Sequence, residues 1–405
     1  RYAEVVSGEW KSLYDRHTAE LSRYKESLAY VSVAPLPWPL PEREPFLSAA
    51  SPLVRALDPQ RGKLPCQAVP KGDERVLHFH LGTPTDPQDG LVRAIRSLAS
   101  GDDAYRKIDW LSDTRYESTT LSYCKEIRPT LVFMQIQTPD VVSPEMIGRI
   151  RERSDPRVVI ATWNGDVASN NSPWSVDWQV PLGRAVDLTL HSSLSHVRAL
   201  RAAGVHTAGY LQIGYDQVQY RLPTGPSDNR PNDVCFLGSR YYGDDYSRSM
   251  RAHDGPLRDA VVGAMRGAFG KRFALYGAGY GDGVVPIPIL QSHEVFWSAK
   301  LAVSISLSNE FELYSSDRLH RALACGGAVL LKRFSRMDSW GLRHRENCLA
   351  WDTVGEAVAL AKSAIATGLW KRVGLAGAKL AAKYHTWDVR VLELQPYLDV
   401  VRAVR

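Results

Sequence analysis

The residues best suited to binding an anion lie in the stretch EFELYSSDRLHRALACGG, residues 310–327. Ser315, Ser316 and Asp317 are residue types that commonly begin helices, and a helix that begins after a buried strand offers free N–H groups to a diphosphate. Arg318 would lie in the first turn of this helix, where a positive charge is unfavourable to the helix dipole, so it needs another reason to be there. Binding a phosphate supplies that reason, and a surface arginine on a capped helix is the alternative.

A second candidate for phosphate binding is the segment FLGSR, residues 236–240. We expect it to end a short apolar strand. Gly238 would let the backbone approach a ligand, and Arg240 can pair with phosphate charge. An ordinary turn would explain the same residues.

Two residues of the first half are candidates for acid–base catalysis. Asp166, in TWNGDVASN (residues 162–170), follows a predicted strand on a glycine-containing loop, and such a carboxylate can take a proton from an acceptor hydroxyl. Asp166 could instead orient the substrate that carries this hydroxyl, or it could stabilise the loop through an Asx turn. His78 and His80 alternate along a predicted strand and therefore face the same side. His80 lies nearer the end of the strand and is the second catalytic candidate, with a histidine buried inside the sheet as the alternative.

Apolar segments that alternate with amphipathic ones must position these candidates. In the first half, we expect strands at residues 76–81, 131–136, 157–162, 187–191 and 208–213, and helices at 88–99, 116–127, 143–153 and 194–203. In the second half, we expect strands at 234–238, 272–277, 301–307, 328–332 and 348–351, and helices at 255–267, 293–299, 316–325 and 354–366. This alternation predicts an α/β protein with a mostly parallel, doubly wound sheet in each half. Two such domains bind ligands in a cleft at the carboxyl ends of their strands.

Shifts in composition predict where the domains begin and end. Residues 1–72 are expected to form a helix followed by a proline-rich linker, and the apolar stripe of the helix either packs on its own protein or joins a homodimer. The polar, proline-containing stretch 220–233 predicts an interdomain linker. We therefore expect Rossmann-like domains at 73–220 and 232–385, and a C-terminal helix at 386–405 that packs back on the first domain.

Four motifs of the second half occur in the order typical of one enzyme family. They are LYGAGY at 275–280, SAKLAVSISL at 298–307, the Ser-x-Arg helix that ends in Ala-Cys-Gly within 310–327, and YHTWDVRV at 384–391. Together they resemble the group 1 glycosyltransferases of the GT-B fold, specifically the CgeB-like branch, over about residues 130–400.

The resemblance implies that the two Rossmann-like domains face a cleft. It also implies that the second domain binds a nucleoside diphosphate sugar as co-substrate, with a UDP-sugar expected. The donor-binding residues would be Gly238, Arg240, Ser315, Ser316 and Arg318 around the diphosphate, with Tyr276 and Gly277 near the base. Asp166 matches a position where relatives often have an aspartate after a tryptophan.

One position departs from the family pattern. Many relatives carry a glutamate shortly before the Ala-x-Gly, where it binds the ribose of the donor, but this chain has Arg321. An arginine cannot accept hydrogen bonds from ribose hydroxyls. Either the ribose contact moves to a residue such as Glu310 or Glu312, or the donor is unusual.

The composition of the 405-residue chain excludes several classes of protein. No apolar run reaches the roughly 18–20 residues that span a bilayer, and we find no signal-peptide pattern, so we expect a cytoplasmic protein without a membrane span. Five scattered cysteines without a Cys-x-x-Cys pair argue against a disulfide framework or a zinc site. No Asp-x-Asp motif stands at a strand end, so we expect no metal cofactor, with arginines and a helix dipole balancing the charge of the donor.

The leading hypothesis is a hexosyl- or pentosyltransferase that moves a sugar from the donor to an acceptor hydroxyl. A base at Asp166 would fit inversion of the sugar, whereas the resemblance favours retention. The acceptor is a saccharide or, alternatively, a flipped 5-hydroxymethyl pyrimidine in DNA, as for phage-type DNA glycosyltransferases. The net charge of +6, the basic segment 240–251, and Trp163, Trp174 and Trp178 would suit DNA. A non-catalytic nucleotide-sugar or nucleic-acid binding module is a third alternative, favoured by Arg321 alone.

Overall fold

The structure of the protein is a computed structural model, which describes residues 72–404 except 83–85, 168–175, 224–229, 241–253, 282 and 307. The predicted N-terminal helix and all of the proline-rich linker except Gly72 lie outside the described residues. The homodimer expected through that helix therefore stays a prediction.

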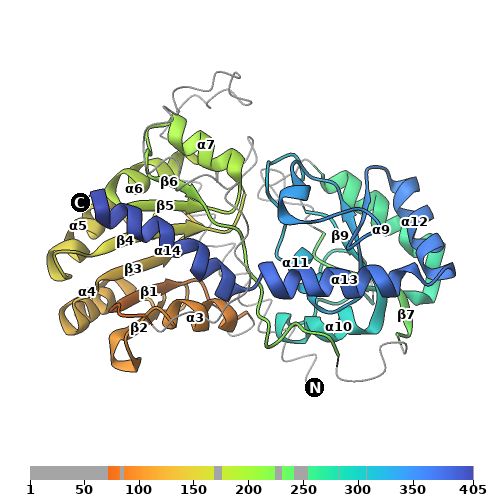
Figure 1. Ribbon diagram of the computed structural model, residues 1–405, viewed down its shortest axis with the longest axis horizontal. Coiled ribbons are helices and arrows are strands. Elements are labelled where there is room, and N and C mark those ends of the chain that lie inside the picture. The colour runs from red at the N-terminus through yellow and green to blue at the C-terminus, as the bar shows by residue number, and fades with distance from the viewer. Residues whose placement is uncertain are drawn as a thin grey trace. The chain divides into compact units, whose positions relative to one another are not determined.

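The first domain contains a six-stranded, wholly parallel sheet with strand order β2-β1-β3-β4-β5-β6. Its strands are β1 (Val76–His80), β2 (Tyr105–Asp109), β3 (Leu131–Gln135), β4 (Val159–Asn164), β5 (Leu188–His191) and β6 (Ala208–Tyr210). Its helices are α3 (Asp89–Arg96), α4 (Tyr116–Ile127), α5 (Pro144–Arg153), α6 (Gln179–Ala185) and α7 (Leu194–Ala202), and helices cover both faces of the sheet (Figure 1).

The interior strand β1 shows why the apolar runs become strands. All five of its residues are buried, and successive side chains enter different cores. Val76 packs with Leu91 of α3, whereas Leu77 and Phe79 pack with Met146 of α5 and its neighbours. A strand that is covered on both faces needs apolar residues at consecutive positions, and parallel sheets commonly have such strands.

The second domain repeats the architecture with a five-stranded parallel sheet of order β11-β10-β9-β7-β8. Its strands are β7 (Asn232–Leu237), β8 (Phe273–Tyr276), β9 (Ala299–Ser304), β10 (Ala328–Lys332) and β11 (Leu349–Trp351). Its helices are α9 (Gly255–Phe269), α10 (Ser292–Ser298), α11 (Arg318–Ala324), α12 (Val354–Ala366) and α13 (Leu369–Tyr384).

The predicted fold class, two parallel α/β domains, is confirmed. One strand was missed: β2 reads YRKID, and only Ile108 of it is buried. This strand lies at the edge of the sheet and pairs only with β1, so it needs no apolar run. In the described part of the chain, no helix has the length and apolarity needed to cross a membrane.

The last helix, α14 (Trp387–Val404), follows the second domain in sequence but packs on the first. It lies against α3, and its residues Val391, Leu394 and Leu398 share a core with strands of the first sheet (Figure 1).

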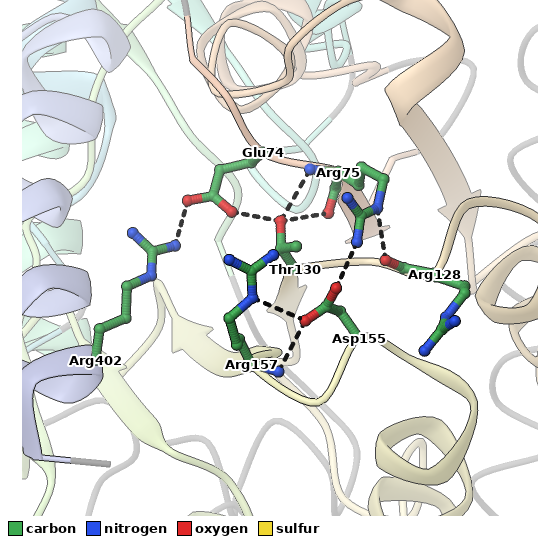
Figure 2. Close-up of polar contacts among 7 residues, drawn as sticks. All are labelled: Glu74, Arg75, Arg128, Thr130, Asp155, Arg157 and Arg402. Carbon is green, nitrogen blue, oxygen red and sulfur yellow. Dashed lines mark hydrogen bonds and ion pairs between the residues drawn. The ribbon is translucent and has the colours of Figure 1, made fainter.

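Polar contacts fix the far end of α14 near the amino-terminal edge of the first sheet (Figure 2). The carboxylate of Glu74, just before β1, pairs with Arg402 of α14 and accepts a hydrogen bond from the Thr130 hydroxyl. Arg75 donates to the Asp155 carboxylate at 2.8 Å. Glu74 therefore joins α14 to the starts of β1 and β3.

Replacement of Glu74 by alanine tests this junction. We expect Glu74→Ala to lower the free energy of unfolding by about 1–3 kcal/mol, because Thr130 and Arg402 both lose a largely buried acceptor. Urea unfolding followed by tryptophan fluorescence measures the change. Glu126→Ala is the control, because it removes an exposed ion pair with Arg106 and should cost less than about 1 kcal/mol. An unchanged unfolding midpoint in Glu74→Ala would contradict the assignment.

Candidate active site at the carboxyl ends of both sheets

A pocket of about 410 Å³ is lined by residues of both domains. In the first domain, they come from the segments that follow β1, β3, β4 and β6, and in the second mainly from the segment between β9 and α11. The lining includes Asp86, Gln88, Asp89, Gln135, Gln137, Trp163, Asp166, Tyr215, Asp216, Gln219, Tyr220, Leu290, Tyr314, Ser316, Asp317, Arg321 and Trp387. The pocket thus occupies the place where doubly wound folds bind ligands.

The catalytic candidate Asp166 lies in this pocket. Its N–H donates to the Asn164 side chain at 2.9 Å, and the preceding Gly165 lies so close to the Trp163 ring that a Cβ there would be 2.7 Å from it. Asp166 is exposed where the pocket opens, yet the protein around it desolvates its carboxyl. This desolvation, together with the negative charge of Asp317, raises the pKa of the Asp166 carboxyl to about 6.

His80, the other catalytic candidate, does not line the pocket. It is fully buried in β1, and its Nδ1 lies 2.7 Å from the Asp109 carboxylate of the neighbouring β2. Burial lowers the pKa of His80, against the opposing effect of Asp109. His80 is therefore a histidine buried inside the sheet, which was the alternative to a catalytic role.

Aspartates dominate the charge of the pocket. The ionisable side chains of the lining belong to five aspartates, one arginine and three tyrosines. They are Asp86, Asp89, Asp166, Asp216, Asp317, Arg321, Tyr215, Tyr220 and Tyr314. Asp216 pairs with Arg93, which projects from α3. Burial raises the pKa of Asp86, and the positive charge of Arg321 opposes this shift. The sequence did not reveal this acidic character, because the aspartates come from separate loops.

Four of the predicted donor-binding residues, Gly238, Arg240, Tyr276 and Gly277, lie at or just after the carboxyl ends of β7 and β8. The N–H of Gly238 donates to the Tyr276 carbonyl at 2.9 Å, and the N–H of Arg240 donates to the Ala278 carbonyl at 2.8 Å. Gly277 has φ +148°, and a Cβ on it would lie 2.1 Å from the Gly238 carbonyl oxygen. Both glycines therefore serve a close approach of two loops. None of these residues lines the pocket itself.

Arg318 and the two serines lie beside them, at the end of β9. The Arg318 guanidinium donates to the carbonyls of Leu237 and Ile305, the latter at 3.0 Å. These bonds give the arginine a structural reason to stand in the first turn of α11, which the sequence did not reveal. The N–H of Ser316 donates to the Ser306 hydroxyl at 2.9 Å, and Ser315 is buried beside the same hydroxyl. Of the seven predicted donor residues, Ser316 alone lines the pocket.

Sequence reasoning missed two residues at this place, Arg258 and Tyr280. Arg258 is buried in the first turn of α9 and donates to the carbonyls of Ser239 at 3.1 Å and Ile305 at 3.0 Å. A positive charge in the first turn of a helix singles out Arg318 in the sequence, and the same feature singles out Arg258.

The Tyr280 hydroxyl is buried without a hydrogen-bond partner among the described residues. Its ring meets Phe236 edge-on, with the ring centroids 6.3 Å apart, and the charges of Arg258, Arg318 and Arg240 all act on it. Burial raises the pKa of Tyr280, so the hydroxyl keeps its proton and is available as a donor. Buried polar groups without partners are uncommon, and this one lies among three arginines.

The YHTWDVRV motif forms the junction with α14. The Thr386 side chain accepts a hydrogen bond from the Val389 N–H at 3.3 Å and so caps the helix. The His385 ring lies 3.1 Å from the Trp340 carbonyl oxygen and 3.0 Å from the Arg390 guanidinium. These contacts correspond to a structural role for the motif.

The structure describes only some of the residues that would suit DNA. Trp174, Arg248 and Arg251 lie outside the described residues. Trp163 is 2 % exposed and donates to the Leu211 carbonyl, so its ring is not open to stack a flipped base. Among the residues that the structure places, no group of three His, Cys, Asp or Glu side chains is arranged to hold a metal ion.

Comparisons with known proteins agree with this architecture. Residues 258–395 match a family model described as glycosyl transferase-like. No curated protein sequence matches the chain. The crystal structure of Anabaena HepE in complex with UDP and glucose is similar over 80 % of this chain and 98 % of that chain, with 13 % identity and a TM-score of 0.52. Its complex with UDP-glucose has the same identity and coverage and a TM-score of 0.51. Sucrose-phosphate synthase from Thermosynechococcus elongatus is similar over 75 % of this chain and 85 % of that chain, with 13 % identity and a TM-score of 0.49.

At such low identity, the similarity to HepE concerns the fold. The GT-B architecture predicted from the sequence is confirmed, whereas assignment to the CgeB-like branch stays a prediction. The chain therefore has the GT-B fold, and residues 258–395 of its second half match a glycosyl transferase-like family.

Proposed function

We propose that the protein transfers a sugar from a nucleoside diphosphate sugar to a hydroxyl group of an acceptor. The observation that carries the proposal is the position of Asp166, a carboxylate of the first domain with a pKa of about 6, in the same pocket as Ser316 at the start of α11. A base from one domain and a donor site on the other can act on one substrate pair only in such a pocket. A UDP-sugar is the expected donor, because HepE, which shares the fold, binds UDP-glucose.

The donor diphosphate is proposed to bind where β7 and β9 end. Arg258 and Arg318 are fixed there by backbone carbonyls, and Arg240 lies nearby in an ion pair with Asp259. The Tyr280 hydroxyl adds an O–H donor. Guanidinium groups and a fixed hydroxyl stabilise the charge that develops on a departing diphosphate. We therefore propose transfer that needs no metal ion.

The reaction forms a glycosidic bond and breaks the bond between the sugar and the diphosphate of the donor. The acceptor oxygen bonds to the anomeric carbon of the sugar, the bond between that carbon and the diphosphate oxygen breaks, and the nucleoside diphosphate leaves with the electron pair. Asp166 takes the proton of the acceptor hydroxyl, which requires its carboxyl to be ionised. His80 has no part in this mechanism, because it lies outside the pocket.

The acidic lining favours an uncharged, polyhydroxylated acceptor, such as a saccharide. Carboxylate and amide side chains, including Asp86, Gln135 and Gln137, are good partners for hydroxyl groups. A DNA phosphate backbone would meet several negative charges in a confined space, and like charges at close range repel. We therefore propose a saccharide acceptor rather than DNA.

Replacement of Asp166 by asparagine tests the mechanism. We expect Asp166→Asn to lower kcat about 100-fold or more, because an amide cannot take the proton, while the affinity for UDP stays the same. In the unaltered protein, kcat/KM should fall as the pH drops below about 6, since Asp166 becomes protonated there, and should level off above it. Asp166→Asn should lose this pH dependence. Initial rates of UDP release with saccharide acceptors measure both.

Asp102→Asn, on the exposed surface of the first domain, controls for the loss of one negative charge. Turnover should be equal with and without EDTA. An Asp166→Asn variant with full turnover would remove Asp166 from the mechanism. Faster transfer to hydroxymethylated DNA than to any saccharide would overturn the proposed acceptor. Nucleotide-sugar binding without any transfer or hydrolysis would indicate a binding module instead.

Replacement of Tyr280 by phenylalanine tests the diphosphate site. We expect Tyr280→Phe to weaken UDP binding about tenfold in isothermal titration calorimetry, because the diphosphate loses one hydrogen bond. The melting temperature of the ligand-free protein should stay equal or rise, since the lost hydroxyl has no partner among the described residues. Tyr123→Phe on α4 is the control. Unchanged UDP affinity in Tyr280→Phe would place the diphosphate elsewhere.

A further inference from the structure

Two hydrogen bonds fix the loop that carries Asp166. They act on the peptide between Gly165 and Asp166, directly after β4. At one end of this peptide, the Asp166 N–H donates to the Asn164 side chain at 2.9 Å. At the other end, the Gly165 carbonyl oxygen accepts a hydrogen bond from the Ser192 hydroxyl, also at 2.9 Å. Both polar groups of the peptide are therefore bonded, so the orientation of its plane is fixed.

Ser192 itself has a fixed position. It directly follows β5, the strand that pairs with β4 in the first sheet (Figure 1). Ser192 is 1 % exposed, and its N–H donates to the Asn164 carbonyl at 3.0 Å. The next residue, Ser193, caps α7, and its N–H donates to the His191 ring at 3.1 Å. The strand before Ser192 and the helix after it thus hold the hydroxyl in place against Gly165.

The glycine at position 165 makes this hydroxyl important. A glycine has access to more backbone conformations than other residues, so a peptide beside it can rotate unless bonds hold it. A larger residue does not fit, because a Cβ on Gly165 would lie 2.7 Å from the Trp163 ring and 2.9 Å from the Gln137 amide. Packing therefore requires a glycine here, and the Ser192 hydroxyl restricts the freedom that the glycine brings.

The loop is held by its backbone, whereas the carboxylate of Asp166 is left for a substrate. Among the residues that the structure describes, none forms a hydrogen bond or an ion pair with this carboxylate. Asp166 is exposed and lines the pocket. A general base acts only within hydrogen-bond reach of the proton that it takes, and a displacement of about 1 Å can lower a rate about 100-fold. The position of the loop therefore matters to the reaction.

We propose that Ser192 is a positioning residue of the transfer reaction. Its hydroxyl holds the peptide between Gly165 and Asp166, and this bond keeps the Asp166 carboxylate within reach of the acceptor hydroxyl. Ser192 acts through Asp166 and not on the substrate, since it lies outside the lining of the pocket. The inference rests on the proposed function, in which Asp166 is the base.

Replacement of Ser192 by alanine measures this role. We expect Ser192→Ala to lower kcat about tenfold or more, because the loop is released, while the calorimetric affinity for UDP stays the same. Initial rates of UDP release from UDP-glucose with saccharide acceptors give kcat. If Ser192 acts only through Asp166, its removal has no effect once that base is gone. The double variant Asp166→Asn/Ser192→Ala should therefore turn over as fast as Asp166→Asn, within about twofold.

The titration of Asp166 gives a second readout, which needs no acceptor. In the unaltered protein, its carboxyl should titrate with a pKa of about 6. A released loop lets water reach the carboxyl, so Ser192→Ala should lower this pKa toward the ordinary value of an aspartate. Carbon-13 NMR of the aspartate carboxyls follows the titration, and the spectrum of Asp166→Asn assigns the signal. Asn164→Ala frees the other end of the same peptide and should shift the pKa in the same direction.

Ser154→Ala is the matched control. Ser154 is a buried serine of the same domain whose hydroxyl donates to the Ile150 carbonyl at 2.7 Å, outside the pocket lining. This variant should keep both kcat and the pKa of Asp166. Full turnover or an unchanged Asp166 pKa in Ser192→Ala would overturn the inference and leave the proposed function in place. An equal loss of turnover with and without Asp166 would do the same. Absence of transfer by the unaltered protein would overturn the proposed function, and the titration would then test the effect of Ser192 on Asp166 by itself.

Discussion

The pocket depends on one short backbone pairing between segments that lie far apart in the sequence. The N–H of Tyr215 donates to the His385 carbonyl at 3.1 Å, and the Tyr215 carbonyl accepts from the Trp387 N–H at 3.2 Å. These bonds join the end of the first domain to the point where the chain returns from the second. Trp387 reaches the pocket because Gly90 and Gly214 have no side chains: a Cβ on either would lie 2.9 or 2.7 Å from its ring. Even an alanine at these glycines would move a wall of the site.

Charge is distributed unevenly around the site that this pairing supports. Arg240, Arg258 and Arg318 gather where the strands of the second sheet end, whereas aspartates line the pocket beside them. A ligand with a doubly charged end and a hydroxyl-rich end matches both regions at once. A ligand that is anionic along its whole length matches only one of them. Electrostatics of this kind selects a substrate by how its charge is placed as well as by its total charge.

The sequence predicted those features that local chemistry determines. Buried strands such as β1 and β3 are apolar at consecutive positions, which is why the sequence predicts them. Gly238 was expected to let the backbone approach a ligand; in the structure, its carbonyl is approached by Gly277 of the neighbouring loop. The position of Asp166 at the pocket could be expected because it follows a strand, and every loop after a strand of a parallel sheet reaches the same edge. The directions of side chains could not be predicted from the sequence, because they depend on neighbours that the fold brings together. Arg318 turns toward the strand ends and Arg321 toward the pocket, although both belong to one helix. The polar edge strand β2 was not predicted, because its pairing with β1, and not an apolar pattern in the sequence, makes it a strand.

The packing of α14 also means that the chain is not synthesised in the order in which its parts are assembled. The helix covers apolar side chains of the first domain, among them Leu91 and Leu131, yet the whole second domain is translated before it. At the usual 5–20 residues per second, that face of the first domain stays uncovered for on the order of ten seconds on the ribosome. During this interval, the nascent first domain presents an apolar surface that a chaperone can bind, and the arrival of α14 is what removes it.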